Sequence, residues 1–444
     1  MELLKNVLKK ISPNERVRTK VKRVSEKLLQ TVREEAKALS LDVEVRLVGS
    51  VAKDTYVNNP DIDIFVMFNP EVNRAEMEKK GLEIGYRVLK GEERYAEHPY
   101  IHGKYLGFEV DIVPCYAVKD ASHLISSVDR TPFHTDFIIS HLRPDQKDEV
   151  RLLKQFMKGI GVYGAEAKVE GFSGYLVELL ILYYGSFEKV IQEASAWKEG
   201  TILYLHQKGK KRFEAPLVFY DPVDIDRNVA SALSLQSFSI FIHACKEFLK
   251  QPHERFFFPP KNKKWSKNRI RLEMTKRGTK ILAFSLRKPS ITDDNLYPQV
   301  RKTLEGASKI LIAHDFVVLS KCALPLRKKI YFIFELQTDL LPIAEKHIGP
   351  PATSDRTDSF LNKWKGKGLA PPYLENGRWM VIKERRYRRA ADAIKNELEK
   401  ASIGSALKRL EGFQVLGHTA ALHSLPISAL TALLDRRYPW ERTP

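Results

Sequence analysis

Two aspartates separated by one residue stand in the segment from 61 to 68, which reads DIDIFVMF. Asp61 and Asp63 alternate with apolar residues, the period of a strand with one polar and one apolar face. Residues i and i+2 of a strand point the same way and lie about 6.5–7 Å apart along the backbone. The two carboxylates can therefore converge in front of a sheet, in a geometry that suits a divalent metal ion.

A third carboxylate, Asp111, lies in a second acidic strand pattern, FEVDIVPCY, from Phe108 to Tyr116. On a neighbouring strand it would complete a site for two Mg²⁺ ions about 3.5–4 Å apart, which activate a hydroxyl and stabilise a leaving phosphate. Three carboxylates repel one another unless metal or nearby lysine neutralises them. A D-x-D pair alone is common and usually lies on a solvated strand face, so the prediction depends on the neighbouring motifs.

Gly49 and Ser50 end the preceding strand pattern, VEVRLVGS, and a helix is expected to start directly after them. Backbone N–H groups at such a junction can hold a triphosphate, and Lys53 adds a positive charge one helical turn further on. Gly-Ser alone is a weak signal. The order G-S-x-A-K-x-T-Y, then D-I-D, then V-D-I-V-P is much more specific.

The elements that must position these residues follow from the hydrophobic pattern. Helices predominate from residue 148 onward, and the segment 256–269, FFFPPKNKKWSKNR, is the best linker candidate because it joins paired prolines to a basic run. Beyond the linker, strands on either side of a helix predict a small α+β domain. The expected helices span 17–39, 74–90, about 230–249 and about 298–313, and the expected late strands span 279–289 and 328–337.

Composition limits the class of protein. Lys and Arg number 74 against 55 Asp and Glu, and a net charge of +19 favours a polyanionic partner. Three scattered cysteines form no C-x-x-C pair, which excludes a disulfide framework and favours a reducing compartment. The most apolar stretch, 175–185, contains Glu178 and is shorter than the ~20 residues of a membrane span, so it predicts a buried helix. Since the first ten residues also lack a signal-peptide pattern, we expect a cytoplasmic protein with no membrane partner.

These motifs resemble those of the polymerase-β-like nucleotidyltransferase superfamily, and more closely those of the archaeal-type, class I, CCA-adding tRNA nucleotidyltransferases. The resemblance covers about 45–300 in long blocks, among them RLVGSVAKDTYVNNPDIDIFVMF, SSVDRTPFHTDFI and DPVDIDRNVASALS, and is looser afterwards, chiefly at YLENGRWM. It implies an α+β multidomain fold. The expected parts are a nucleotidyltransferase domain with a mixed sheet over 1–145, a mainly helical central domain at the nucleotide pocket over 146–258, and an α+β tRNA-binding portion over 259–444.

The resemblance also implies roles for single residues. The metal-binding catalytic carboxylates match Asp61, Asp63 and Asp111, the first of which can be Glu in this family. Contacts to the incoming nucleotide match Ser50, Lys53, His134, Lys154, Tyr163 and Arg227, the last reading the base edge. Without the resemblance, His134 would be assigned to a turn, Lys154 to a solvated helix face and Tyr163 to the core.

The implied activity is addition of C, C and A to the 3′ end of tRNA. CTP and ATP would be the substrates and Mg²⁺ the cofactor, with no nucleic-acid template, and incomplete ends would be repaired in the same way. A poly(A) polymerase or another terminal RNA nucleotidyltransferase would share the metal site, and a non-catalytic RNA-binding protein would share the fold. A homodimer is left open. Glu97 and His98 resemble metal ligands, but their proline-containing loop predicts a structural role instead of zinc binding.

Three basic runs extend along the chain: KGKKR at 208–212, KNKKWSKNRIR at 261–271 and KERRYRR at 383–389. One such run is usually a solvated face. Two of the three contain an aromatic residue, Trp265 or Tyr387, and rings can stack on bases while cations contact phosphates. We therefore expect a tRNA surface that contacts the acceptor arm and elbow. The contacting residues are predicted to be Arg385, Arg386, Arg388 and Arg389.

Overall fold

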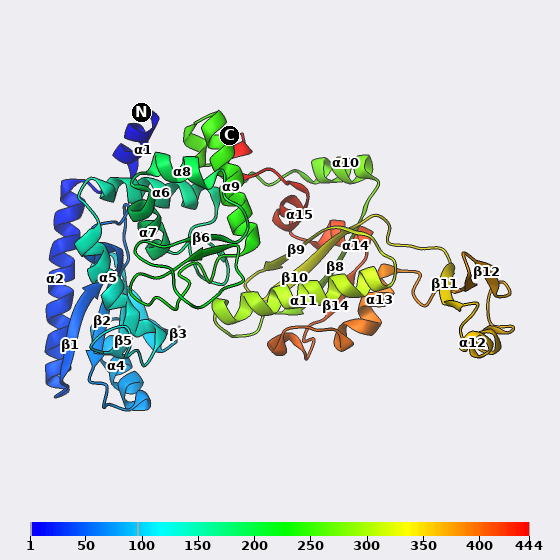
Figure 1. Ribbon diagram of the computed structural model, residues 1–444, viewed down its shortest axis with the longest axis horizontal. Helices are drawn as coiled ribbons and strands as arrows, with labels where there is room; N and C mark the ends of the chain where they lie inside the picture. Colours follow the sequence, from blue (N-terminus) through cyan, green and yellow to red (C-terminus); the bar gives the residue numbers. More distant parts are fainter. Residues whose placement is uncertain (1, 96, 444) are drawn as a thin grey trace. The chain divides into compact units, whose positions relative to one another are not determined.

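The computed structural model describes residues 2–95 and 97–443, and the chain divides into two compact units (Figure 1). The first comprises Met1–Asn262 and Arg437–Pro444, and the second comprises Lys263–Arg436. The boundary falls inside the predicted linker 256–269. Residues Arg437–Pro444, which fall in the predicted C-terminal portion 259–444, belong to the first unit. Trp440 is buried there and stacks on Phe256 at a centroid distance of 5.4 Å. The local sequence pattern does not predict this contact.

The first unit contains a mixed sheet, as predicted, and the sheet has five strands. Its order is β1-β2-β5-β4-β3, and β2 and β5 run parallel while the other neighbours run antiparallel. The helices α2 (Glu15–Ala38) and α4 (Arg74–Val88) pack on one face. The strands are β1 (Val43–Val48), β2 (Ile62–Phe68), β3 (Gly91–Tyr95), β4 (Pro99–Tyr105) and β5 (Phe108–Tyr116).

Beyond Asp63, strand β2 is buried on both faces. Its expected apolar face packs under α2 and α4, and Phe65 and Met67 on the other face join a smaller cluster with Val113 of β5. Asp63 is the only acidic residue within the strand, and Asp61 directly precedes it. The two aspartates therefore lie at the polar N-terminal end of a strand that is otherwise buried.

Helices form most of the rest of the first unit and most of its largest core, to which the short strands β6 and β7 also contribute. The apolar segment near 175–185 is the buried helix that the sequence predicts, and Ser173 caps it by accepting a hydrogen bond from the backbone N–H of Leu176. In residues 2–95 and 97–443, no helix is long and apolar enough to cross a membrane. The remaining elements are α1 (Glu2–Ile11), α3 (Gly49–Ala52), α5 (Arg130–His141), α6 (Gln146–Ile160), α7 (Gly174–Tyr184), α8 (Phe187–Ala194), α9 (Leu235–Lys250) and the parallel pair β6 (Thr201–Leu203) and β7 (Leu217–Phe219).

The second unit is α+β, as expected. Its antiparallel four-stranded sheet has the order β14-β8-β10-β9, with α11 and α13 packed on one face and α10, α14 and α15 on the other. A three-stranded sheet, β11-β13-β12, carries α12. The bounds are β8 (Lys280–Arg287), β9 (Val318–Pro325), β10 (Lys329–Leu336), β14 (Gln414–Leu416), β11 (Ala344–Pro351), β12 (Tyr373–Glu375), β13 (Arg378–Glu384), α10 (Lys267–Arg277), α11 (Asp293–Ala313), α12 (Thr357–Trp364), α13 (Ala390–Glu397), α14 (His418–Ser424) and α15 (Ile427–Leu434).

Candidate active site

Parallel pairing of β2 with β5 brings the predicted carboxylates to one place. Asp63 and Asp111 are direct partners in the register of these strands, and Asp61 precedes Asp63 by two residues. Burial raises the pKa of Asp63 to about 7, and the negative charges of Asp111 and Asp61 add to the shift. Burial and the charge of Asp111 also raise the pKa of Asp61. The three side chains therefore act on one another electrostatically.

Asp111 has a partner that sequence reasoning did not identify. Its Oδ1 lies 2.6 Å from Nδ1 of His102, which faces it from β4, and the other ring nitrogen of His102 lies 3.2 Å from Glu109. In the part of the chain that the structure describes, no three acidic, histidine or cysteine side chains gather closely enough to hold a metal ion as they stand. The donors nonetheless fit a hard divalent cation, because they are carboxylate oxygens whose mutual repulsion such an ion would relieve.

Gly49 explains why the motif before the aspartates contains glycine. Its φ is +72°, and a Cβ at this position would lie 2.1 Å from Oδ2 of Asp63. Its backbone N–H donates to Oγ1 of Thr135 in α5 at 3.4 Å. Ser50 follows in the one-turn helix α3, and its carbonyl accepts a hydrogen bond from the N–H of Thr55. The glycine therefore lets the backbone approach the carboxylate more closely than any other residue would.

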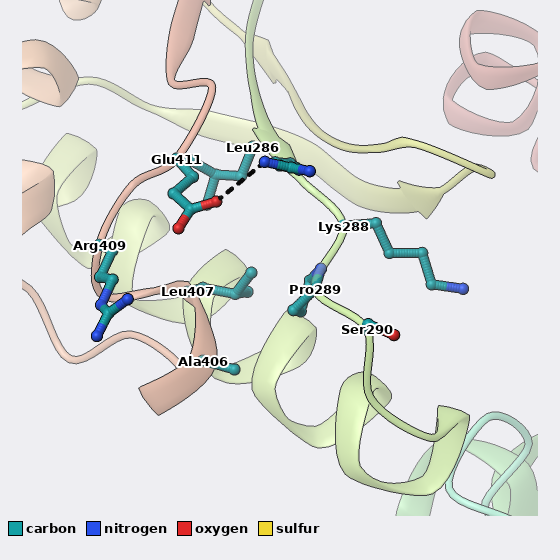
Figure 2. Close-up of a pocket in the computed structure, with 9 residues that line it drawn as sticks. Leu286, Lys288, Pro289, Ser290, Ala406, Leu407, Arg409 and Glu411 are labelled. Carbon is teal, nitrogen blue, oxygen red and sulfur yellow. Dashed lines mark ion pairs between the residues drawn. The ribbon is translucent and has the colours of Figure 1, made fainter.

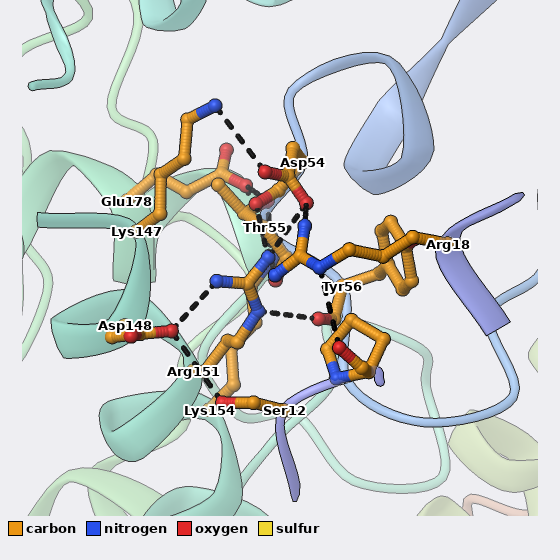
Figure 3. A network of polar contacts seen from close by, with 11 residues as sticks. Ser12, Arg18, Asp54, Thr55, Tyr56, Lys147, Asp148, Arg151, Lys154 and Glu178 are labelled. Atoms are coloured by element: carbon orange, nitrogen blue, oxygen red, sulfur yellow. Dashed lines mark hydrogen bonds and ion pairs between the residues drawn. The ribbon is translucent and has the colours of Figure 1, made fainter. Parts of the chain in front are cut away.

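A buried carboxylate, Glu178, binds two of the predicted nucleotide-binding lysines, Lys53 and Lys154. Figure 3 shows Lys154 and Thr55 beside it. Lys53 donates to Oε2 of Glu178 at 2.6 Å, and Lys154 donates to Oε1 at 3.0 Å. Thr55 donates to Oε1 at 2.6 Å and accepts from Lys154 at 3.0 Å. Burial alone would raise the pKa of Glu178, but the charges of Lys154 and Lys53 outweigh it and hold the pKa at about 2. Burial lowers the pKa of Lys53, against the opposing charge of Glu178. With both lysines charged, the cluster has two cations and one anion, so it can attract a further anion.

Tyr163 lies beside this cluster. Lys158 lies over its ring at 5.1 Å, and a Cβ added to Gly174 would lie 3.1 Å from its hydroxyl oxygen. Burial, followed by the charge of Glu178, raises the pKa of Tyr163 above its ordinary range. Its hydroxyl therefore stays neutral and can donate a hydrogen bond at physiological pH.

A second buried carboxylate, Asp221, contacts two further residues that were predicted to bind the nucleotide, His134 and Arg227. Its Oδ2 lies 2.8 Å from Nε2 of His134 and accepts from Nη1 of Arg227 at 2.9 Å. Its Oδ1 accepts from Tyr175, whose ring stacks on His134 at 3.9 Å. Burial lowers the pKa of His134, although Asp221 acts in the opposite direction. The base-reading arginine expected from the sequence is therefore held on one side by the carboxylate of Asp221.

An outer polar network ties the loop between α3 and β2 to two helices (Figure 3). Asp54, at a φ of +50°, accepts hydrogen bonds from Arg18 of α2 and Arg151 of α6, each at 2.7 Å. Arg151 is almost fully buried and also donates to the carbonyl oxygens of Asp54 and Tyr56. Because Lys53 and Thr55 flank Asp54 in sequence, this network fixes the segment that carries them.

Comparison with known proteins places the chain in a family. Residues 26–134 match a nucleotidyltransferase domain, 148–258 the second domain of tRNA nucleotidyltransferases, and 277–417 the C-terminal domain of the CCA-adding enzyme. The CCA-adding enzyme of Methanosarcina acetivorans is 39% identical over 420 residues, which cover 92% of each chain. That of Methanothermobacter thermautotrophicus is 40% identical over 92% of each chain, and that of Thermoplasma acidophilum is 38% identical over 95% of this chain and 96% of its own. The chain belongs to the CCA-adding enzymes.

The resemblance found in the sequence is thereby confirmed for this CCA-adding enzyme, including the nucleotidyltransferase activity and the use of divalent metal typical of its superfamily. The residues missed by sequence reasoning are His102, Glu178 and Asp221. Glu178 gave a signal, because an acid inside an apolar run must find a buried cation. Asp221 belongs to the block DPVDIDRNVASALS, where several aspartates compete and spacing alone does not select one.

The predicted tRNA-contacting run of this CCA-adding enzyme is not uniform. Arg386, Arg388 and Arg389 are exposed, and Arg386 lies over the ring of Tyr387 at 5.2 Å. Arg385 differs, because its side chain is 9% exposed and pairs with Asp315 and Glu345 at 2.5 and 3.2 Å. It is therefore bound within the protein, which disfavours the predicted tRNA contact at this position.

Trp265 requires a correction. Its position inside a basic run predicts a ring that stacks on bases, and this prediction is wrong. The ring is 8% exposed, packs in the core around α10 and α15, and is covered by Arg269 at 4.2 Å. A ring buried in this way has no face left for a nucleotide.

Proposed function

We propose that this CCA-adding enzyme adds C, C and A to the 3′ end of tRNA from CTP and ATP, with Mg²⁺ as the metal, and repairs incomplete ends without a nucleic-acid template. The observation that supports the proposal best is the register pairing of Asp63 with Asp111 beside Gly49. This pairing concentrates carboxylate charge next to a buried, positively charged cluster. The arrangement suits a metal-assisted transfer of a nucleotidyl group.

The proposed metal ligands are Asp61, Asp63 and Asp111. Two Mg²⁺ ions held by these carboxylates would lower the pKa of the primer 3′-hydroxyl and neutralise charge on the triphosphate. Gly49 keeps space for the carboxylate of Asp63 at its present position. Asp111 lies within hydrogen-bond distance of the His102 ring, which orients the carboxylate from the β4 side.

The proposed contacts to the triphosphate are Ser50 and Lys53, and His134, Lys154 and Tyr163 are proposed as further contacts to the nucleotide. Lys53 and Lys154 are held in fixed positions by Glu178, so binding a triphosphate costs little of their conformational entropy. The neutral hydroxyl of Tyr163 supplies a donor that needs no counter-charge. In this site the chain positions the reactants and neutralises their charge.

Arg227 is the proposed reader of the base edge. Asp221 occupies one side of its guanidinium, and the remaining N–H groups can face cytosine O2 and N3 or the ring nitrogens of adenine. Uracil and guanine carry a ring N–H at the corresponding place, and a buried donor left unpaired costs about 1–3 kcal/mol. The switch from C to A then requires the growing 3′ end to reshape the pocket.

The test is an incorporation assay with a tRNA transcript that ends at the discriminator base. Each nucleotide is supplied alone and then all together, and the products are sequenced. We expect two C residues from CTP alone and CCA from CTP with ATP, whereas a poly(A) polymerase would largely ignore CTP. Failure of the wild-type protein to extend the transcript at any Mg²⁺ concentration, with no difference from Asp111→Ala, would favour a non-catalytic RNA-binding role.

We also propose that the enzyme works in the cytoplasm as a homodimer. Free Cys115, Cys245 and Cys322 suit a reducing compartment. Strand β9 is an edge of its sheet, and it carries exposed Leu319 next to exposed Val317. Light scattering on the purified full-length chain measures the mass, and a monomer at micromolar concentration would exclude the dimer.

A further inference from the structure

Basic residues from three separate segments meet at one end of the four-stranded sheet in the second unit. The end of β8, the hairpin between β9 and β10, and the turn before β14 come together there. The N–H of Lys288 donates to the carbonyl of Lys328 at 3.0 Å, and the N–H of Arg287 donates to the carbonyl of Glu411 at 2.7 Å. We call this surface the basic sheet end. Its members are Arg287, Lys288, Arg327, Lys328, Lys329, Lys408 and Arg409.

The basic sheet end is accessible and weakly neutralised. Arg287 is 74% exposed, and all the other members except Lys288 are exposed as well. Two acids, Glu411 and Asp293, pair with it at 3.6 Å, one with Arg287 and one with Lys288. The surface therefore keeps a strong excess of positive charge.

A pocket opens within the same surface (Figure 2). Its volume is about 390 Å³, and Lys288 and Arg409 stand on opposite sides of it. Buried Leu286 and Leu407 contribute apolar wall, and Ser290 contributes a hydroxyl. Cations around a partly apolar hollow of this size suit a ribose with its flanking phosphates.

We propose that the basic sheet end binds the phosphate backbone of the tRNA substrate, with a ribose–phosphate unit in the pocket. This inference rests on the proposed function and adds to it a surface distinct from the arginines at 386–389. Lysines and arginines gathered from separate loops match the irregular spacing of phosphates in a folded RNA. RNA backbone is recognised mainly through phosphates and 2′-hydroxyls, which need no base-specific geometry.

The test uses the full-length chain and a tRNA transcript lacking CCA. The variant Arg327→Gln, Lys328→Gln, Lys329→Gln removes three charges from an exposed hairpin. The control variant Lys22→Gln, Arg23→Gln, Lys27→Gln removes three exposed charges from α2. The dissociation constant is measured by fluorescence anisotropy over a series of KCl concentrations, and the melting temperature of each variant is recorded.

We expect the hairpin variant to bind tRNA about tenfold more weakly near 0.15 M salt and to lower the slope of log K against log salt by about 2. The KM for tRNA should rise with unchanged kcat and unchanged KM for CTP. The control should bind like wild type. The pair Arg287→Gln, Arg409→Gln at the pocket serves as a second variant if the hairpin variant does not fold.

Two outcomes would overturn the inference. One is tRNA affinity and salt slope equal to those of the control for both surface variants. The other is normal tRNA binding combined with a loss of binding to phosphatidylserine vesicles, which would assign the surface to a membrane. Wild-type protein that extends no tRNA would instead refute the proposed function, so the two failures are distinguishable.

Discussion

Gly49 shows how closely the site is built around a single carboxylate. The glycine has a left-handed backbone, and its missing side chain leaves the space that Asp63 Oδ2 occupies. Any larger residue must either move the backbone of α3 or displace Asp63. The same atoms therefore determine both the local fold and the proposed metal site.

Gly49→Ala should abolish most activity with little loss of stability. A left-handed alanine costs about 1 kcal/mol, and a displacement of about 1 Å at a reacting centre can cost 10²-fold in kcat. Gly161→Ala is the matched control, because Gly161 has a φ of +82° and nothing within 4 Å of its Cβ position. CTP incorporation and melting temperature are measured for both. Equal activity in the two variants would mean that Asp63 is not fixed by Gly49.

Asp63→Asn should stabilise the metal-free protein, and more so at pH 8 than at pH 5. Burial raises the pKa of Asp63 from 3.8 to about 7, so the folded state binds this proton more tightly than the unfolded state. Stability therefore falls as pH rises from about 4 to about 7, and Asn removes that loss. The melting temperature in EDTA checks the result. Mg²⁺ should then raise the melting temperature of the wild type and not of the variant.

The control for this pH effect is Asp136→Asn, at an exposed carboxylate paired with Arg46 at 2.6 Å. It should show no gain in EDTA at pH 8. A melting temperature of Asp63→Asn equal to that of the wild type at both pH values would remove the argument from carboxylate repulsion.

Arg227→Ala should relax discrimination against UTP and GTP. Removing the donors that an N–H of uracil or guanine would face costs roughly one to two decades of selectivity. Misincorporation on tRNA ending in CC is measured relative to ATP incorporation. Arg130→Ala, which breaks the nearby pair with Asp224 at 2.7 Å, is the control and should leave selectivity unchanged. If Arg227→Ala slows all four nucleotides equally, the arginine serves structure or phosphate binding.

At the scale of elements, the periodicity of apolar residues predicted the strands and helices that residues close in sequence determine. Alternation identified β2 and β5, and helical spacing identified α2, which begins at Glu15 because Asn14 caps it. Contacts between distant segments were not predictable in this way. Glu178 meets Lys53 over 125 residues, and Trp440 returns to Phe256 across the whole second unit, because folding brings them together and no local pattern encodes the partner.

The hydrogen bonds that Arg151 of α6 donates to the loop before β2 should stabilise the folded protein. Arg151→Ala should lower the free energy of unfolding by about 3 kcal/mol, because it leaves the buried carbonyl oxygen of Tyr56 and the partly buried one of Asp54 without their donor. Arg18→Ala, on the more exposed side of the same Asp54, should cost less than about 1 kcal/mol. Urea unfolding measures both. Similar losses for the two variants would contradict the view that α6 anchors this loop.

At the scale of the whole molecule, the excess of positive charge is shared by several surfaces. A net charge of +19 is far more than the nucleotide site uses, since its lysines are balanced in part by Glu178. The charge left over favours long-range attraction to a polyanion, which speeds association and makes it sensitive to salt. Individual runs must then be tested for tRNA binding one by one.

Binding of tRNA by the exposed arginines at 386–389 can be tested against their buried neighbour, Arg385. Arg386→Gln, Arg388→Gln and Arg389→Gln together should weaken tRNA binding and lower the slope of log K against log salt by about 0.7–0.9 for each phosphate that the protein no longer neutralises. Nucleotide binding should not change. Arg385→Gln is the control, because its buried guanidinium pairs with Asp315 and Glu345, so it should lower the melting temperature and leave the slope intact. A slope that changes only with Arg385→Gln would mean that the exposed arginines are solvated, and that the buried one orders a surface that contacts tRNA elsewhere.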